Sequence, residues 1–293
     1  MTDCPWSQAA VVDVYEASPS GGIIYKVSPS GTQSVFLSGF TSLNGLAGDG
    51  SGNLYAVDSG FAGGAVIKIT ATGTRTTFAT GIPGGTGIAR DTAGNLFVAS
   101  STANSIQKIT LGGTVSTFAT GLNGPVGVAL DGNGNVFVAN FALGNTGNGT
   151  ITKITSGGTK TTFASGLTQP YGLAVDSANN LYAAEEASQS ILKFTPAGVR
   201  STFFNLFTNG PNTVPLGVAV DSDNNVYSAD GAFGGSYIHQ YTPGGTLSVL
   251  GTTSNSPAFI AVQPVPEPGT IAMLALGGCL LVGRRRQPAR LTR

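Results

Sequence analysis

Charged residues are scarce in this 293-residue sequence, where they make up 10% of the chain and leave a formal net charge of zero. Their distribution is uneven. Residues 1–263 hold nine Lys or Arg against thirteen Asp or Glu, and residues 264–293 hold five Arg against one Glu. A nucleic-acid-binding protein needs clustered basic residues to displace counterions from phosphates. The mildly acidic body has no such cluster, so nucleic acid is excluded as a partner.

Cysteine and histidine are almost missing as well. Cys4 and Cys279 lie at opposite ends of the chain, so neither a structural disulfide nor a four-ligand zinc site is expected. His239 is the single histidine. A three-histidine zinc site is therefore excluded, and a His-based catalytic triad is not expected. His239 lies in the stretch "YIHQY", which we interpret as an outer strand with a solvated histidine.

Glycine is abundant, with 44 residues, and it marks a unit that recurs about every 40 to 45 residues. The first half of the unit reads "GVALDGNGNVFVAN" from Gly127. Similar copies begin at Gly45, Gly87, Gly172 and Gly217. In the second half a Thr or Ser is followed eight residues later by a bulky apolar residue. The pairs are Ser28 and Phe36, Thr70 and Phe78, Thr110 and Phe118, Thr155 and Phe163, Thr195 and Phe203, and Thr242 and Leu250. A period of this length indicates propeller blades or solenoid turns.

Each unit predicts four short strands. An apolar first strand leads into a turn that starts with Asp and has Asn four residues later, because these side chains bond nearby backbone amides. The pairs are Asp49 and Asn53, Asp91 and Asn95, Asp131 and Asn135, Asp176 and Asn180, and Asp221 and Asn225. The "DGNGN" and "DSDNN" stretches imitate the start of an EF-hand loop, but their recurrence in every unit favours a turn. One such sheet cannot bury both its faces, whereas six arranged radially cover one another.

The two ends of the body complete each other. Residues 14–18 match the second strand of a unit that lacks its first strand, and residues 259–262 match a first strand that lacks the remainder. We therefore predict an all-β, six-bladed propeller in one domain, 1–263, closed by its N- and C-terminal strands. The remaining segment, 264–293, is predicted to be separate and to contain a short apolar helix.

The repeated unit resembles the NHL repeat. Its pattern, P-x-G-v-A-v-D-x-x-G-N-l-Y-v-A-D, is approximated at residues 125–140, 170–185 and 215–230, and the resemblance covers roughly residues 10–263. It implies a six-bladed β-propeller of NHL type. Such propellers serve as enzymes, sensors, ligand binders and scaffolds, so the fold leaves function open. Relatives in architecture include calcium-dependent gluconolactonases and NHL-type lyases that use zinc.

One face of the predicted propeller carries the long insertions, at residues 140–150 and 204–215, and variable loops are the usual place for binding. Strand ends on this face should rim the central channel and supply the candidate ligand or metal residues Asn44, Asp58, Asn140, Tyr171, Glu185 and Asp230. Their oxygen atoms suit calcium. The alternative is that strand-end Asp and Asn side chains only satisfy backbone amides. In the gluconolactonases Glu, Asn and Asp at strand ends hold the metal. Among the residues just before the first strands of this chain, Asn44 alone resembles such a metal ligand. Calcium is the one cofactor considered, and no cofactor is assigned.

A lysine recurs in the third strand of five units, at Lys26, Lys68, Lys108, Lys153 and Lys193. These lysines alternate with apolar neighbours. We expect them to form a charged outer rim, which discourages edge-to-edge aggregation of sheets.

The last thirty residues contain "PVPEPGTIAMLALGGCLLVGRRRQ". Its apolar part, 271–282, would span about 18 Å as a helix at ~1.5 Å per residue, short of the ~30 Å hydrocarbon core of a bilayer. The stretch resembles a PEP-CTERM sorting signal, with the motif Val265, Pro266, Glu267 and Pro268, then the apolar segment, then Arg284, Arg285 and Arg286. The alternative is an ordinary tail anchor. The arginines would stay on the cytoplasmic side.

This resemblance implies recognition by an exosortase in the inner membrane of a Gram-negative bacterium. The implied sequence is export, transient membrane anchoring, cleavage near the motif, and release to the cell surface or the exopolysaccharide matrix. The chain begins without the basic and apolar regions of a signal peptide. We therefore expect upstream in-frame codons to encode one.

Two functions fit the sequence. The first is a monomeric binding or extracellular-matrix module, which contacts a glycan, a small ligand or a protein through the loop-rich face. The second is a metal-dependent hydrolase or lactonase that uses Asp58, Asn140, Glu185 and Asp230. No catalytic residue is assigned.

Overall fold

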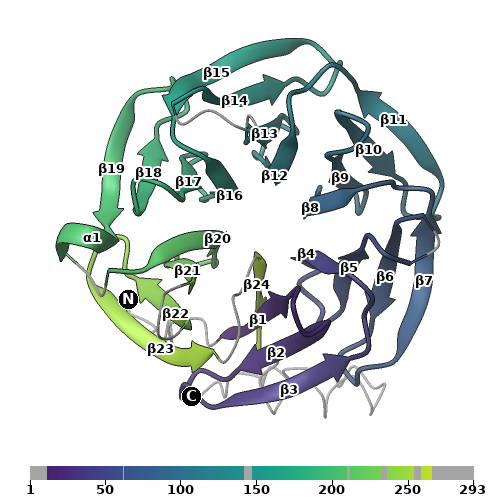
Figure 1. Ribbon diagram of the computed structural model, residues 1–293, viewed down its shortest axis with the longest axis horizontal. Coiled ribbons are helices and arrows are strands. Elements are labelled where there is room, and N and C mark those ends of the chain that lie inside the picture. The colour runs from purple at the N-terminus through teal and green to yellow at the C-terminus, as the bar shows by residue number, and fades with distance from the viewer. Residues whose placement is uncertain are drawn as a thin grey trace, which may run out of the picture.

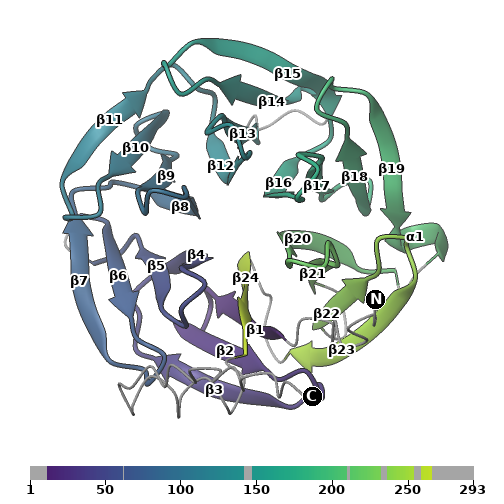
Figure 2. The same cartoon turned by 180° about the vertical axis from the view of Figure 1, so that it is seen from behind.

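The computed structural model describes residues 12–61, 63–141, 147–209, 212–231, 236–253 and 259–265. In these ranges six four-stranded antiparallel sheets stand radially around a central axis (Figure 1), and the view from behind shows the same closed ring (Figure 2). The predicted all-β, six-bladed propeller is confirmed. The apolar helix predicted near the C-terminus lies outside the described residues. No helix within them is long and apolar enough to cross a membrane.

Each blade runs from an inner strand at the axis to an outer strand at the rim (Figure 1). Blade 1 consists of β24 (Phe259–Pro264), β1 (Val12–Ser18), β2 (Ile23–Val27) and β3 (Gln33–Ser38). Blade 2 consists of β4 (Leu43–Gly48), β5 (Leu54–Asp58), β6 (Ala65–Ile69) and β7 (Arg75–Thr80). Blade 3 consists of β8 (Gly85–Arg90), β9 (Leu96–Ser100), β10 (Ser105–Ile109) and β11 (Val115–Ala119).

The second half of the ring repeats this order. Blade 4 consists of β12 (Pro125–Leu130), β13 (Val136–Asn140), β14 (Gly149–Ile154) and β15 (Lys160–Leu167). Blade 5 consists of β16 (Pro170–Val175), β17 (Leu181–Glu185), β18 (Ser190–Phe194) and β19 (Arg200–Asn205), followed by the short helix α1 (Leu206–Asn209). Blade 6 consists of β20 (Val214–Val220), β21 (Val226–Gly231), β22 (Ser236–Tyr241) and β23 (Leu247–Thr253).

Blade 1 closes the ring because it takes strands from both ends of the chain. β24 pairs antiparallel with β1, from Val12 opposite Pro264 to Ala17 opposite Phe259. The latch predicted from residues 14–18 and 259–262 is therefore confirmed. The inner strand of blade 1 ends at Pro264.

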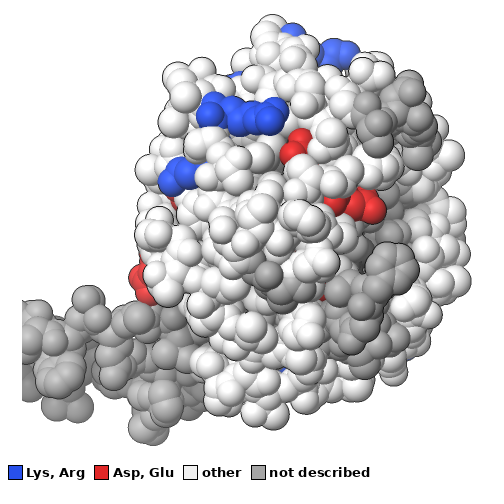
Figure 3. Space-filling view, turned by 60° about the vertical axis from the view of Figure 1, so that its left-hand side comes forward, with Lys and Arg blue, Asp and Glu red and all other residues white. Residues whose placement is uncertain are grey.

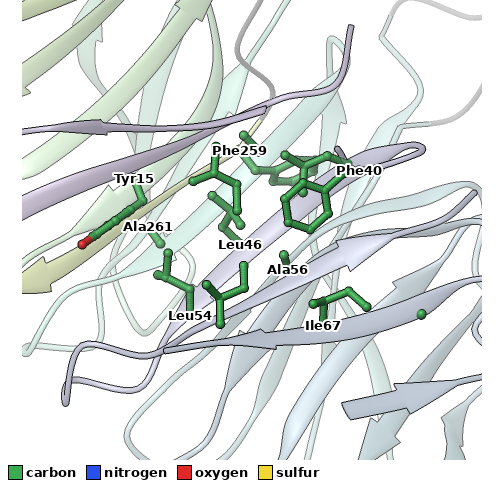
Figure 4. Close-up of a cluster of buried hydrophobic side chains, with 13 residues drawn as sticks. Tyr15, Phe40, Leu46, Leu54, Ala56, Ile67, Phe259 and Ala261 are labelled. Atoms are coloured by element: carbon green, nitrogen blue, oxygen red, sulfur yellow. The ribbon is translucent and has the colours of Figure 1, made fainter. Parts of the chain in front are cut away.

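The cores lie between blades, so both faces of each middle strand are covered. In β5 all five residues are buried. Leu54 and Ala56 join a core shared with blade 1, and Tyr55 and Val57 join one that includes residues of blade 3. Figure 4 shows the first of these clusters. Burial of each large apolar side chain contributes about 1.5–3 kcal/mol relative to exposure.

The Asp and Asn pairs form the turns expected between first and second strands. At Asp131, Oδ1 accepts hydrogen bonds from the backbone N–H of Asn133 at 3.0 Å and of Asn135 at 2.9 Å. The Nδ2 group of Asn135 donates to Asp131 Oδ2 at 2.7 Å. The carboxylate thus satisfies its own turn, and the turn interpretation of "DGNGN" is supported over an EF-hand loop.

The recurrent lysines lie in the third strand of blades 1 to 5 rather than at the rim. Each ammonium group lies over an aromatic ring of the second strand, at 5.1–5.8 Å from the ring centroid. The same ring packs edge-on against a phenylalanine of the outer strand, as in Tyr55 with Phe78 at 5.2 Å. Lysine and phenylalanine therefore cover the aromatic ring near the edge of the blade.

Candidate functional site

The long-loop face of the ring holds the loops between second and third strands and the connections that enter each first strand. Four candidate residues, Asp58, Asn140, Glu185 and Asp230, lie here at the ends of β5, β13, β17 and β21. All four are buried, with exposed fractions of 0–4%. They belong to second strands, so an inner strand lies between each of them and the axis (Figure 1).

Asp58 holds the connection that enters its own blade. Its Oδ2 accepts a hydrogen bond from the backbone N–H of Thr41 at 3.0 Å, and its Oδ1 accepts one from Ser42 at 2.8 Å. Both carboxylate oxygens are therefore bonded to amides of the β3–β4 connection.

The same contact recurs at a spacing of 17 residues in three other blades. Ser100 Oγ donates to the carbonyl of Pro83, Glu185 Oε1 accepts from the N–H of Thr168 at 2.7 Å, and Asp230 Oδ2 accepts from Thr213 Oγ1 at 3.3 Å. Glu185 Oε2 also accepts a hydrogen bond from Ser188. We call these the strand-end contacts. These contacts agree with the alternative in which strand-end side chains form hydrogen bonds to nearby segments of the chain and hold no ligand.

Asn140 differs from this pattern. Its Nδ2 donates to the hydroxyls of Thr150 at 3.0 Å and Thr152 at 2.9 Å, both in β14. Its Oδ1 is buried and has no hydrogen-bond partner among the described residues. Asn44 lies in the inner strand of blade 2 and donates to Ser59 Oγ at 2.9 Å and to the carbonyl of Gly85, in blade 3, at 3.2 Å. Its amide thus links two blades.

Glycine lets successive inner strands approach each other at the axis. A Cβ atom on Gly127 would lie 1.9 Å from the carbonyl oxygen of Tyr171, and one on Gly45 would lie 2.4 Å from that of Thr86. Only glycine fits at such an approach. In blade 1 the register places Ala261 opposite Tyr15 just as Ala47 lies opposite Tyr55 in blade 2. Phe259 therefore occupies the position that Gly45 holds in blade 2.

This phenylalanine closes the axis on the long-loop side. Its ring lies 5.3 Å from that of Tyr171, which comes from blade 5, and Tyr171 also packs edge-on against Phe141 at 6.2 Å. Val126 of blade 4 packs against the same cluster. Burial raises the pKa of the Tyr171 hydroxyl, and the nearby carboxylate of Glu186 raises it further. Tyr171 is thus brought to the axis, as predicted, but in an apolar contact.

A cavity of about 230 Å³ lies along the axis, and the inner strands of all six blades line it. Its lining is apolar except for backbone groups and one charged side chain, Arg90. Phe259 forms part of its wall.

His239 is the main correction to the sequence interpretation. It was expected to be solvated, but its side chain is fully buried, on β22 in the third position of blade 6. Its Nδ1 is hydrogen-bonded to Asp230 Oδ2. The ring stacks on Tyr237 at 5.6 Å, and within the described ranges both His239 Nε2 and Asp230 Oδ1 are buried without a hydrogen-bond partner. The physical reason is that neighbouring blades cover both faces of a third strand. The position of His239 in the blade therefore decides its burial, although its side chain is polar.

A second pocket lies between blades 1 and 2, with a volume of about 280 Å³. It is lined by residues 39–41, the end of β5, the start of β7 and Phe61, which is 44% exposed. Sequence reasoning missed this pocket. One signal was available, because the "SGFAGG" loop of blade 2 is two residues longer than the "STAN" loop at the same place in blade 3.

Calcium needs several oxygen ligands around one point. Both oxygens of Asp58 and of Glu185 already accept hydrogen bonds from the protein. Among the four strand-end candidates, the side-chain oxygens without a partner in the described residues are Asn140 Oδ1 and Asp230 Oδ1, which belong to blades 4 and 6. No group of three acidic, histidine or cysteine residues suitable for a metal occurs in the part of the chain that the structure describes. This donor set fits calcium poorly.

Residues 264–287 match the PEP-CTERM protein-sorting motif. No curated protein sequence matches the chain. The chain is thus a six-bladed β-propeller that carries a PEP-CTERM sorting motif directly after its closing strand. The motif implies export and membrane-associated sorting. Its core residues Pro266, Glu267 and Pro268, and the arginines at 284–286, lie outside the described residues.

Solved structures share the fold. The propeller is similar to a chain of a nidogen/laminin complex at 18% identity and a TM-score of 0.71, over 86% of this chain and 98% of that one. It is similar to virginiamycin B lyase from Staphylococcus aureus at 20% identity and a TM-score of 0.56, over 77% and 71%. It is also similar to the calcium-binding protein regucalcin from Agrobacterium tumefaciens at 14% identity and a TM-score of 0.61, over 76% and 78%. At these identities the likeness establishes the fold alone.

Proposed function

We propose that this protein is an exported binding module, which an exosortase sorts through its C-terminal motif and which binds its ligand on the long-loop face. The observation that carries the proposal is the position of the motif. The ring is closed by β24, which ends at Pro264, and the motif occupies residues 264–287. Removal of the tail therefore leaves all six blades intact.

The strand-end contacts support a binding role over a catalytic one. Asp58 and Glu185 use both of their oxygens to hold local chain segments, so they stabilise the scaffold from which the loops project. The surface itself carries few charges, as the view in Figure 3 shows, which suits a ligand recognised by shape and hydrogen bonds. Loops held by a rigid scaffold are a common place for binding residues in proteins.

The sorting step is tested in the native host with the full chain. Replacement of Pro266, Glu267 and Pro268 by alanine should retain the protein in the membrane fraction, while the unchanged chain reaches the outer envelope or the medium. Replacement of Pro288 by alanine, just beyond the matched motif, is the control and should change nothing. Equal distribution of the wild-type and motif variants would refute the sorting role.

A metal-dependent hydrolase or lactonase remains the second candidate, because Asn140 Oδ1 and Asp230 Oδ1 are buried without partners in the part of the chain that the structure describes, and similar folds include a calcium-binding protein. Calcium titration followed by thermal melting tests it. A rise of Tm with calcium that is lost in Asp230→Asn, together with chelator-sensitive lactone hydrolysis, would favour this function. Unchanged melting with calcium would remove it.

A further inference from the structure

The pocket between blades 1 and 2 combines an exposed aromatic side chain with polar groups. Phe61, on the loop between β5 and β6, is 44% exposed, whereas most large apolar residues of the ring are buried. The exposed residues Thr76 and Thr77 of β7 line the same pocket. An aromatic ring and hydroxyl groups in one pocket suit a ligand that presents both C–H groups and hydroxyls.

Arg75 places one fixed positive charge in the same pocket. Its Nη1 donates to the carbonyls of Ser38 at 3.1 Å and Gly39 at 3.4 Å, and its guanidinium lies 5.6 Å from the ring of Phe40. These contacts hold the side chain in place. Within the described residues its Nε and Nη2 make no hydrogen bond, so they remain to bind a carboxylate in the planar geometry that guanidinium groups favour.

The one carboxylate in the pocket wall, that of Asp58, is partly compensated by hydrogen-bond donors of the protein. Asp58 is 4% exposed, and the amides of Thr41 and Ser42 hold both of its oxygens. The pocket volume of about 280 Å³ lies near the lower end of the ~300–1,000 Å³ range of small-molecule pockets, which suits a ligand as small as one sugar ring.

We propose that this pocket binds a carboxylate-bearing sugar ring, such as a uronic acid residue of a polysaccharide. Phe61 would stack on the C–H face of the ring, Thr76 and Thr77 would bond its hydroxyls, and Arg75 would pair with its carboxylate. The inference rests on the proposed binding function and names the ligand class for one site on the ring.

The test uses the full chain and saturation-transfer difference NMR with D-glucuronate and D-glucose, which differ at C6. Wild-type protein is expected to bind glucuronate about tenfold more tightly than glucose, as one charge-assisted contact provides. Phe61→Ala should abolish binding of both sugars. Arg75→Gln should remove the preference and keep glucose binding.

Two matched controls come from blade 5 and the helix that follows it. Arg200 begins the outer strand of blade 5 as Arg75 begins that of blade 2, and Phe207 on α1 is 64% exposed. Arg200→Gln and Phe207→Ala should both bind as the wild type does, and far-UV circular dichroism should show all four variants folded. Absence of sugar binding by the wild type, or unchanged binding by Phe61→Ala, would overturn the inference.

A second experiment separates this inference from the proposed function. Polysaccharide isolated from the host envelope is sedimented with the full-length protein and with Phe61→Ala. Loss of co-sedimentation in the variant supports both proposals. Equal co-sedimentation keeps the proposed function and refutes this pocket as its site, and no co-sedimentation of the wild type refutes the proposed polysaccharide ligand.

Discussion

Phe259 and Tyr171 lie with their ring centroids 5.3 Å apart, although they come from blades 1 and 5, which are not neighbours in the ring. The contact is possible because Phe259 takes the place of a glycine in the inner strand, and its side chain extends toward the axis. The closing strand therefore contributes to the ring in two ways, by pairing with β1 and by placing Phe259 in the wall of the axial cavity.

Phe259→Ala should destabilise the propeller by about 3–5 kcal/mol, the usual cost of emptying a buried phenylalanine site. Urea unfolding followed by circular dichroism measures the loss. Phe207→Ala is the control, because that ring is 64% exposed and should change stability by less than about 0.5 kcal/mol. Equal stability of the two variants would show that the axial contact is not part of the core.

The close approach of inner strands makes a second prediction. Gly127→Ala would place Cβ 1.9 Å from the carbonyl oxygen of Tyr171, so the backbone must shift. We expect a loss of about 1–3 kcal/mol, as for overpacked cores. At Gly157, which lies in a surface turn, the nearest atom to a new Cβ is 3.8 Å away, and Gly157→Ala should be nearly neutral. Thermal melting of both variants decides whether the glycine is required for packing.

The buried pair of His239 and Asp230 gives a third prediction. Both side chains are fully buried, so removal of one partner deprives the other of this hydrogen bond where water cannot easily replace it; among the described residues, Asp230 Oδ2 then keeps only the hydroxyl of Thr213. His239→Leu and Asp230→Leu should each cost about 3–5 kcal/mol, and the double variant should cost less than the sum of the two. Denaturant unfolding of the four proteins gives the coupling, and additive losses would contradict a direct interaction.

Asp49 predicts a pH dependence. Its burial raises the pKa of the carboxyl, but hydrogen bonds from Asn53 and from the amides of Ser51 and Asn53 outweigh burial, and the pKa is lowered from 3.8. A lowered folded-state pKa stabilises the protein above the unfolded pKa, and this stabilisation is lost as pH falls through the folded value. Asp49→Asn should therefore be less stable than wild type at pH 7, and the difference should shrink below about pH 4.

Acid titration of thermal stability for the two proteins checks this prediction. A difference that grows as the pH falls would contradict it. The sign would then point to a carboxyl whose charged form is disfavoured in the folded state.

The sequence was informative where the same residues recur for the same physical reason. The glycine of the first strand, the Asp–Asn turn and the fixed Thr-to-Phe spacing each reflect one constraint of a blade, so their repetition predicts the ring. Closure was also predictable, because residues 14–18 and 259–262 are complementary parts of one blade.

The site was less predictable because it depends on contacts between blades. Nothing in "YIHQY" shows that Asp230 and the rings of Tyr237 and Tyr241 lie against His239. Nor does the sequence show that Asp58 bonds the connection 17 residues before it, rather than facing the axis. Phe259 was visible as an exception to the glycine pattern, but its partner Tyr171 is distant in sequence and is found only once the ring is closed.

The most direct measurement is the C-terminus of the protein recovered from the outer envelope or medium of its host, determined by mass spectrometry of the intact chain and its C-terminal peptide. Cleavage by an exosortase predicts a terminus close to the motif at residues 265–268, with the propeller through β24 retained and the arginines at 284–286 absent. Recovery of the mature protein with Arg293 still present would contradict sorting by cleavage of this tail.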